Sequence, residues 1–130
     1  MGKWQIDAML DAALQYLEDN ATIMTVCSAQ PANYAEATTT YDGGASKYKI
    51  ADIAIDSSDF TGPADGTTNG RKTTINQQAD VPVDATATAT HIALSSGTTL
   101  LYVTTCTSQA LTSGNTVTIP AWSIEIADAT

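Results

Sequence analysis

The last third of the chain restricts the possible folds most, because it reads as short strands separated by tight turns. Residues 85–130 run ATATATHIALSSGTTLLYVTTCTSQALTSGNTVTIPAWSIEIADAT. β-Branched side chains recur throughout this stretch, and such side chains fit the pleated, half-exposed surface of a sheet. Gly97 and Gly114-Asn115 mark the turns between the strands. The stretch therefore predicts successive antiparallel strands, and it contains few groups that could carry out chemistry.

The same pattern predicts strands elsewhere in the chain. Threonine makes up roughly one residue in six, well above its usual share, which favours strands with a polar but weakly charged surface. Pro120 divides the last run into two short strands, or marks a bulge in one strand at a sheet edge. Residues 56–71 are rich in turn formers, with Phe60 as a core anchor. The expected strands are 21–28, 48–55, 72–78, 85–94, 99–105 and 116–127.

One helix is expected, at residues 5–19, with Asn20 as its stop signal. A single amphipathic helix cannot form a core alone, so its apolar stripe should pack on the sheet. We therefore expect an α+β fold, mainly an antiparallel β-sandwich with one N-terminal amphipathic helix packed on a sheet. The residues at helical spacing on the apolar stripe are Ile6, Met9, Leu10, Ala13, Leu14 and Leu17.

The length of 130 residues fits a single domain with one core. We expect an N-terminal arm at 1–5, the helix at 5–19 and a β-rich part at 21–130. Residues 30–47 read as a long loop, and loops of this length in small domains are usually functional or disordered. The chain has no apolar run long enough to span a membrane and no signal-peptide pattern, so synthesis in a cytoplasm is expected.

The charge balance is strongly acidic, with 14 Asp and Glu against 5 Lys and Arg, a net charge of −9 and a pI near 4.1. Such a field repels phosphate backbones and anionic membrane surfaces, so neither nucleic acid nor membrane is an expected partner. A charged partner should present basic patches. The simpler interpretation, that the charge only keeps the surface soluble, stays open.

The residues capable of nucleophilic chemistry are few. Cys27 and Cys106 both lie in apolar strand contexts, where free core thiols are favoured over a disulfide. His91, the sole histidine, lies in an Ala/Thr strand without a nucleophile motif, so a strand histidine is favoured over a general base. A pairing of either thiol with His91 stays open.

The acidic loops give no sign of a metal or acid–base site. The segment 65–70 (DGTTNG) lacks the alternating donors and the closing Glu of a calcium loop, so a turn explains it. The pairs Asp56/Asp59 and Asp80/Asp84 are interpreted as solvated loop charges. No phosphate-binding, dinucleotide or zinc motif is present. We therefore expect no catalytic, cofactor-binding or metal-binding residues, and no enzyme activity.

The residues that could contact a protein partner are more informative. Trp4 lies ahead of the helix near the terminus, whereas Trp122 is expected to pack inside, and exposed Trp is favoured at interfaces. Arg71 and Lys72 form a basic doublet that could contact an acidic neighbour. The interface candidates are Trp4, Arg71 and Lys72, together with Tyr34 and Tyr41 of the loop 30–47.

Several segments resemble small structural proteins encoded by tailed bacteriophages, often near the capsid genes. These segments are DAMLDAALQYL (7–17), TVCSAQPANYAEATTTY (25–41), GRKTT (70–74) and residues 89–128. The resemblance implies a virion component located on the capsid surface, with decoration or cementing of the head as its role. It also implies the major capsid protein and neighbouring copies of the chain itself as partners, and it carries over no active-site residues.

Three other functions stay open. A tail, collar or fibre component would share the same sequence features. A carbohydrate-binding β-sandwich would need an aromatic platform, and the aromatic residues here are scattered along the chain. A hydrolase using His91 is the least favoured. The aromatic residues in question are Trp4, Tyr34, Tyr41, Tyr48, Tyr102 and Trp122.

Overall fold

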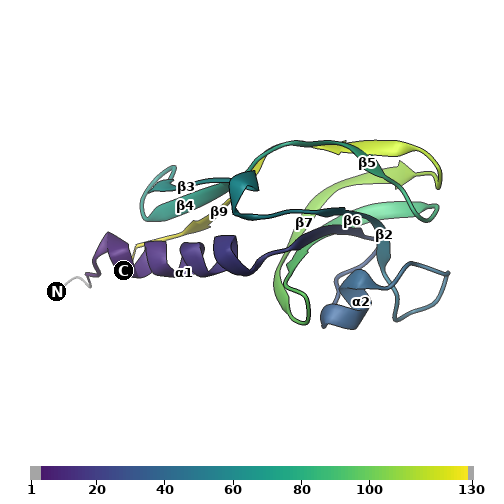
Figure 1. Ribbon diagram of the computed structural model, residues 1–130, viewed down its shortest axis with the longest axis horizontal. Coiled ribbons are helices and arrows are strands. Elements are labelled where there is room, and N and C mark those ends of the chain that lie inside the picture. Colours follow the sequence, from purple (N-terminus) through teal and green to yellow (C-terminus); the bar gives the residue numbers. More distant parts are fainter. Residues whose placement is uncertain (1–3, 129–130) are drawn as a thin grey trace.

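The computed structural model describes residues 4–128. It has an α+β fold with mostly antiparallel β-structure and one long helix, as expected (Figure 1). The elements are α1 (Asp7–Asn20), β1 (Ile23–Cys27), α2 (Tyr34–Thr38), β2 (Lys49–Ala54), the 3-10 helix η1 (Ser57–Asp59), β3 (Phe60–Asp65), β4 (Arg71–Ile75), β5 (Gln78–Pro82), β6 (Ala87–Ser95), β7 (Leu100–Leu111), β8 (Thr116–Ile119) and β9 (Trp122–Ile126).

The strands form three sheets, with the orders β2-β1-β6-β7, β3-β4-β9 and β5-β8. Every pairing between neighbouring strands in these sheets is antiparallel. Figure 1 shows the β3-β4-β9 sheet and α1 at one end of an elongated molecule, with α2 at the other end. The two ends of the described chain come together beside α1, where Gln5 Nε2 donates to Asp128 Oδ1 at 3.0 Å.

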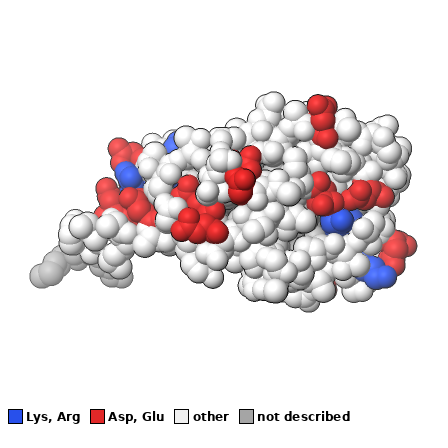
Figure 2. Space-filling view, in the orientation of Figure 1, with Lys and Arg blue, Asp and Glu red and all other residues white. Residues whose placement is uncertain are grey.

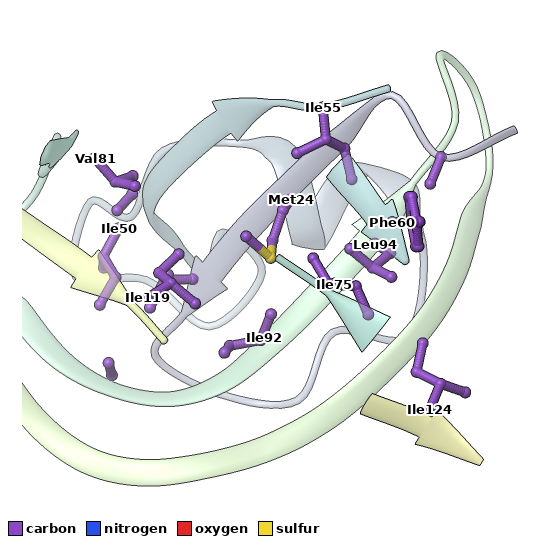
Figure 3. Packing of buried hydrophobic residues seen from close by; sticks show 14 of the residues in the cluster. Met24, Ile50, Ile55, Phe60, Ile75, Val81, Ile92, Leu94, Ile119 and Ile124 are labelled. Carbon is purple, nitrogen blue, oxygen red and sulfur yellow. The ribbon is translucent and has the colours of Figure 1, made fainter. Parts of the chain in front are cut away.

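One core cluster connects the three sheets, as Figure 3 shows, and it also includes residues of the long helix. The cluster contains Leu14 and Leu17 of α1 and apolar side chains from all three sheets. Each sheet therefore buries its apolar face by packing against the other sheets and the helix. Burial of this shared surface is the main stabilising contribution. The largest fully buried apolar side chains in it are Leu14, Met24, Ile50, Ile75, Val81 and Leu94.

The packing of α1 differs from the expected stripe. Leu14 and Leu17 are buried, but Ile6 and Met9 are 53% and 64% exposed. The prediction that the whole stripe faces the sheet was therefore wrong for the side of the stripe that carries Ile6 and Met9. The physical reason is the rotation of the helix about its axis, because Asp11 of α1 is ion-paired to Arg71 of β4. This contact turns the acidic side of the helix toward β4, and Ile6 and Met9 outward.

The expected loop 30–47 contains a short helix, α2. Asn33 Oδ1 accepts from the Glu36 amide at 2.9 Å, and Glu36 Oε1 accepts from the Ala32 amide at 2.7 Å. Side-chain acceptors of this kind satisfy amides that the first turn of a helix leaves unpaired. A helix of five residues is too short to produce a hydrophobic period, so the sequence pattern missed it.

Strand boundaries also differ from those expected. The loop assigned to 56–71 contains η1 and β3, the run 72–78 divides into β4 and the start of β5, and β7 extends to Leu111. At Pro120 the two-strand alternative is confirmed, since β8 and β9 are separate strands in different sheets.

Candidate functional site

The most exposed large apolar side chains of the described residues gather at α1. Trp4 is 83% exposed, and Ile6, Met9 and Tyr16 are between 53% and 64% exposed. Ile6, Met9, Ala13 and Tyr16 follow one another at steps of three or four residues, which places them along one side of a helix. We call these four residues and the adjacent Trp4 the α1 face.

The α1 face has no partner among the described residues, although the apolar surface continues around the helix into the core. Leu14 and Leu17 occupy the buried side of the same helix. Soluble monomers rarely leave a contiguous apolar patch of more than a few hundred Å² in water, and such patches mark interaction sites. Trp and Tyr are also the residues most often found at the energetic centre of protein interfaces. The α1 face therefore has the properties of a protein-binding surface.

Arg71 fixes the position of α1 but is not free to contact a partner. Its Nε lies 2.7 Å from Asp11 Oδ1 and its Nη1 lies 2.7 Å from Asp65 Oδ1, with Asp7 Oδ2 at 4.0 Å. The hydrogen bond to Asp11 is the main cause that raises the pKa of Arg71. The sequence suggested contact with an acidic neighbour, and the structure shows that the chain itself supplies three such carboxylates.

The other three polar candidates lie apart from one another. Lys72 of β4 is opposite Glu125 of β9 in the strand register, while Tyr34 begins α2 and Tyr41 packs at the rim of the core. Because α2 and α1 lie at opposite ends of the molecule (Figure 1), Tyr34 and Trp4 cannot contribute to one compact site. Trp4, Arg71 and Lys72 belong to the end that carries α1 and β4.

The basic residues of the described chain are accompanied by acids, and Figure 2 shows clusters of Asp and Glu on a face that is otherwise largely uncharged. Lys47 pairs with Asp42 at 2.9 Å, and Lys49 lies 3.0 Å from Asp52 and 3.4 Å from Asp84. Every charged residue of α1 itself is acidic, namely Asp7, Asp11, Glu18 and Asp19. A partner of the α1 face is therefore complementary when it combines apolar side chains with Lys or Arg.

Lys49 joins an acidic pair that the sequence pattern did not reveal. Asp52 and Asp84 share a hydrogen bond beside Lys49, which raises the pKa of Asp84. Burial raises the pKa of Asp52, but hydrogen bonds with Asp84 and Lys49 outweigh this and lower it overall. Asp84 was expected to be a solvated charge paired in sequence with Asp80. Its actual neighbours come from β2, which only the folded chain brings close.

The cysteines and the histidine form no activated nucleophile. The Cys27 thiol donates to the Ala37 carbonyl at 3.8 Å and lies 3.6 Å from Thr25 Oγ1, and burial raises its pKa to about 11. His91 is opposite Cys27 in the register of β1 and β6, but its Nδ1 lies 2.8 Å from Thr90 Oγ1. Reactive thiols have lowered pKa values, so Cys27 has the properties of a core residue. Both Cys27 and Cys106 are free.

In the acidic loops, the carboxylates of Asp56 and Asp59 accept hydrogen bonds from nearby backbone amides. Asp56 Oδ1 accepts from the Ser58 amide at 2.8 Å and Asp59 Oδ2 accepts from the Asp56 amide at 2.9 Å, which forms a capping box around η1. The loop 65–70 closes through a hydrogen bond from the Gly66 amide to the Gly70 carbonyl. Within residues 4–128 no group of three or more His, Cys, Asp or Glu is arranged to hold a metal ion.

A groove of about 420 Å³ lies between β7 and the segment 117–123. Trp122 lines it and stacks on Tyr102, with ring centroids 6.0 Å apart. Both rings are partly buried against the core, so they do not form an open aromatic platform for a sugar. Trp122 was expected to pack inside, and it does so at the rim of the core.

The helices of the described chain include none that is long and apolar enough to cross a membrane. No family model, curated protein or solved structure matches the chain.

Proposed function

We propose that this protein is a non-enzymatic structural component of a tailed bacteriophage virion. In this role it is a capsid decoration or cement protein that binds the outside of the head and bridges major capsid subunits. The α1 face is the observation that supports this role most directly, since it is an uncovered apolar surface on an otherwise acidic molecule. The resemblance of residues 7–17, 25–41, 70–74 and 89–128 to phage structural proteins supports it as well.

The architecture suits a protein whose role is to bury surface against several neighbouring subunits. We take the three sheets to enclose the shared core as a β-sandwich, with α1 packed against β3 and β4 and its outer side free. A rigid frame loses little conformational entropy on binding, which favours affinity. Each copy that bridges several capsid subunits gains avidity from the combination of weak contacts.

The energy available at Trp4 can be estimated from its exposure. An indole side chain exposes up to about 250 Å². At 83% exposure and about 25 cal/mol per Å², complete burial contributes at most roughly 5 kcal/mol. Interface hot spots cost about 2–4 kcal/mol when truncated, so Trp4→Ala should weaken binding by roughly 30-fold or more.

The test uses phage heads that lack the protein and a titration of purified chain onto them. Trp4→Ala and Tyr16→Ala should both reduce occupancy at a fixed concentration. Gln15→Ala is the matched control, because Gln15 lies on the same helix, is exposed and faces away from the α1 face. Unchanged occupancy in both aromatic variants would remove the α1 face as the capsid contact.

A tail, collar or fibre location is the alternative within the same virion class. It would use the same apolar contact but on a structure present in few copies. Antibody or density labelling of the particle separates the two locations, since a decoration protein covers the head.

A further inference from the structure

The strand β7 presents a long open edge. It is the outermost strand of the β2-β1-β6-β7 sheet, and its 12 residues pair with β6 only. No backbone hydrogen bond joins Leu100–Leu111 to any other described segment. At about 3.3 Å per residue the edge is up to roughly 40 Å long. Its outward N–H and C=O groups are therefore available to another strand.

The edge of β7 lacks the charges, the proline and the short length that protect most such edges, although two bulges interrupt its pairing with β6. Exposed edge strands are usually kept apart by charged side chains, proline or short length. The other outer strands of the described sheets follow this rule: β2 has Lys49 and Asp52, β3 has Pro63, β5 has Asp80 and Pro82, β9 has Glu125, and β8 is four residues long. By contrast, β7 reads LLYVTTCTSQAL, with no charge and no proline.

The groove beside this edge is equally free of charge. It is lined by Thr104–Thr107 of β7 and by residues 117–123, and none of its lining side chains is charged. β7 bulges here, because His91 is opposite Thr105 whereas Ala89 is opposite Gln109. Trp122, which lines the groove, has a buried indole N–H without an acceptor among the described residues. The groove, at about 420 Å³, therefore has room for side chains of a further chain.

We infer that β7 is a self-association edge, where the β7 strand of a second copy pairs antiparallel across a two-fold axis. This pairing doubles the four-stranded sheet, and side chains of the incoming strand enter the groove. Both copies use the same surface, as a two-fold interface requires.

A second copy is the occupant because the uncharged edge of β7 is complementary to itself across a two-fold axis, where the same unpaired N–H and C=O groups meet without like charges. Two chains of net charge −9 repel one another over most of their surface. The edge of β7 and its groove provide a region without acids, where main-chain hydrogen bonds and apolar burial act without this repulsion. The inference does not depend on the virion proposal, since it concerns a different surface and is tested on the purified chain alone.

The test measures the mass of the purified chain by sedimentation velocity from low micromolar to millimolar concentration. We expect a monomer–dimer equilibrium that persists in high salt. Thr107→Lys places a charge at the exposed edge beside the groove, and should weaken dimerisation at least tenfold. Thr88→Lys is the control, because Thr88 is exposed on the neighbouring strand β6.

Hydrogen exchange on the unmodified chain gives a second readout that needs no variant. Amides of residues 100–111 should exchange more slowly as the concentration rises, while those of β3 and β4 should not change. A wild-type mass of one chain over the whole range, a dimer that Thr107→Lys leaves intact, or protection confined to α1 would each overturn the inference. Particle occupancy is measured separately, so a failure here is distinct from a failure of the virion proposal.

Discussion

Replacing Glu18 by Gln should stabilise the protein at neutral pH. Glu18 is 5% exposed, and its Oε2 is buried without a hydrogen-bond partner among the described residues. Burial raises the pKa of Glu18, and the negative charges of Asp19 and Asp11 raise it further. The carboxylate also lies near the C-terminal end of α1, where the helix dipole disfavours a negative charge.

The sign of the pH dependence follows from the raised pKa. Below the unfolded value of 4.5, Glu18 is protonated in both states and its full contribution to stability is present. As the pH rises, the unfolded chain loses this proton first, so the free energy of unfolding falls until the folded pKa is passed. A buried group without partners costs about 1–3 kcal/mol. Since Glu18 retains a little exposure, we expect Glu18→Gln to gain about 1 kcal/mol at pH 7.

Urea unfolding followed by far-UV circular dichroism, between pH 4 and pH 8, measures this difference. The gain in Glu18→Gln should be absent at pH 4 and should grow as the pH rises. Asp80→Asn is the control, since Asp80 is an exposed carboxylate on β5 and is not one of the charges that act on Glu18. A difference that does not vary with pH, or a loss of stability in Glu18→Gln at pH 7, would refute the reasoning.

Two further predictions concern the backbone and the thiols. Gly70 has φ of +74°, and an added Cβ would overlap the Ile126 carbonyl, so Gly70→Ala should cost about 2 kcal/mol or more. Gly97→Ala, which meets open space, should change the melting temperature little. Cys106 should react with a thiol reagent at pH 8 well before Cys27, whose burial raises its pKa to about 11. Equal rates in the folded protein would contradict this.

Most of the strands and the position of α1 could be predicted because they depend on local patterns, whereas β3 lies in a segment that was expected to be a loop. Alternation, β-branched residues and Gly-containing turns identify strands without knowledge of their partners. The assignment of strands to sheets could not be predicted, because it depends on distant contacts. β8 and β9 are separated by only Pro120 and Ala121, yet they pair with β5 and β4 in different sheets.

The candidate site could also be predicted only in part from the sequence. Trp4 could be proposed as an exposed anchor from its type and its place near the terminus, and it is 83% exposed. The exposure of Ile6 and Met9 could not be proposed, because hydrophobic periodicity does not show which half of a wide apolar stripe is covered. Here that choice follows from the ion pair of Arg71 with Asp11, residues 60 positions apart in the chain.

The most direct test of the proposed function is an image reconstruction of the purified particle that locates this chain. The account predicts density for the fold on the outer surface of the head, in copies that scale with the number of major capsid subunits. The end that carries α1 and Trp4 should face the shell. A few copies at the neck or tail, absence from the particle, or an α1 face turned toward solvent would contradict the account.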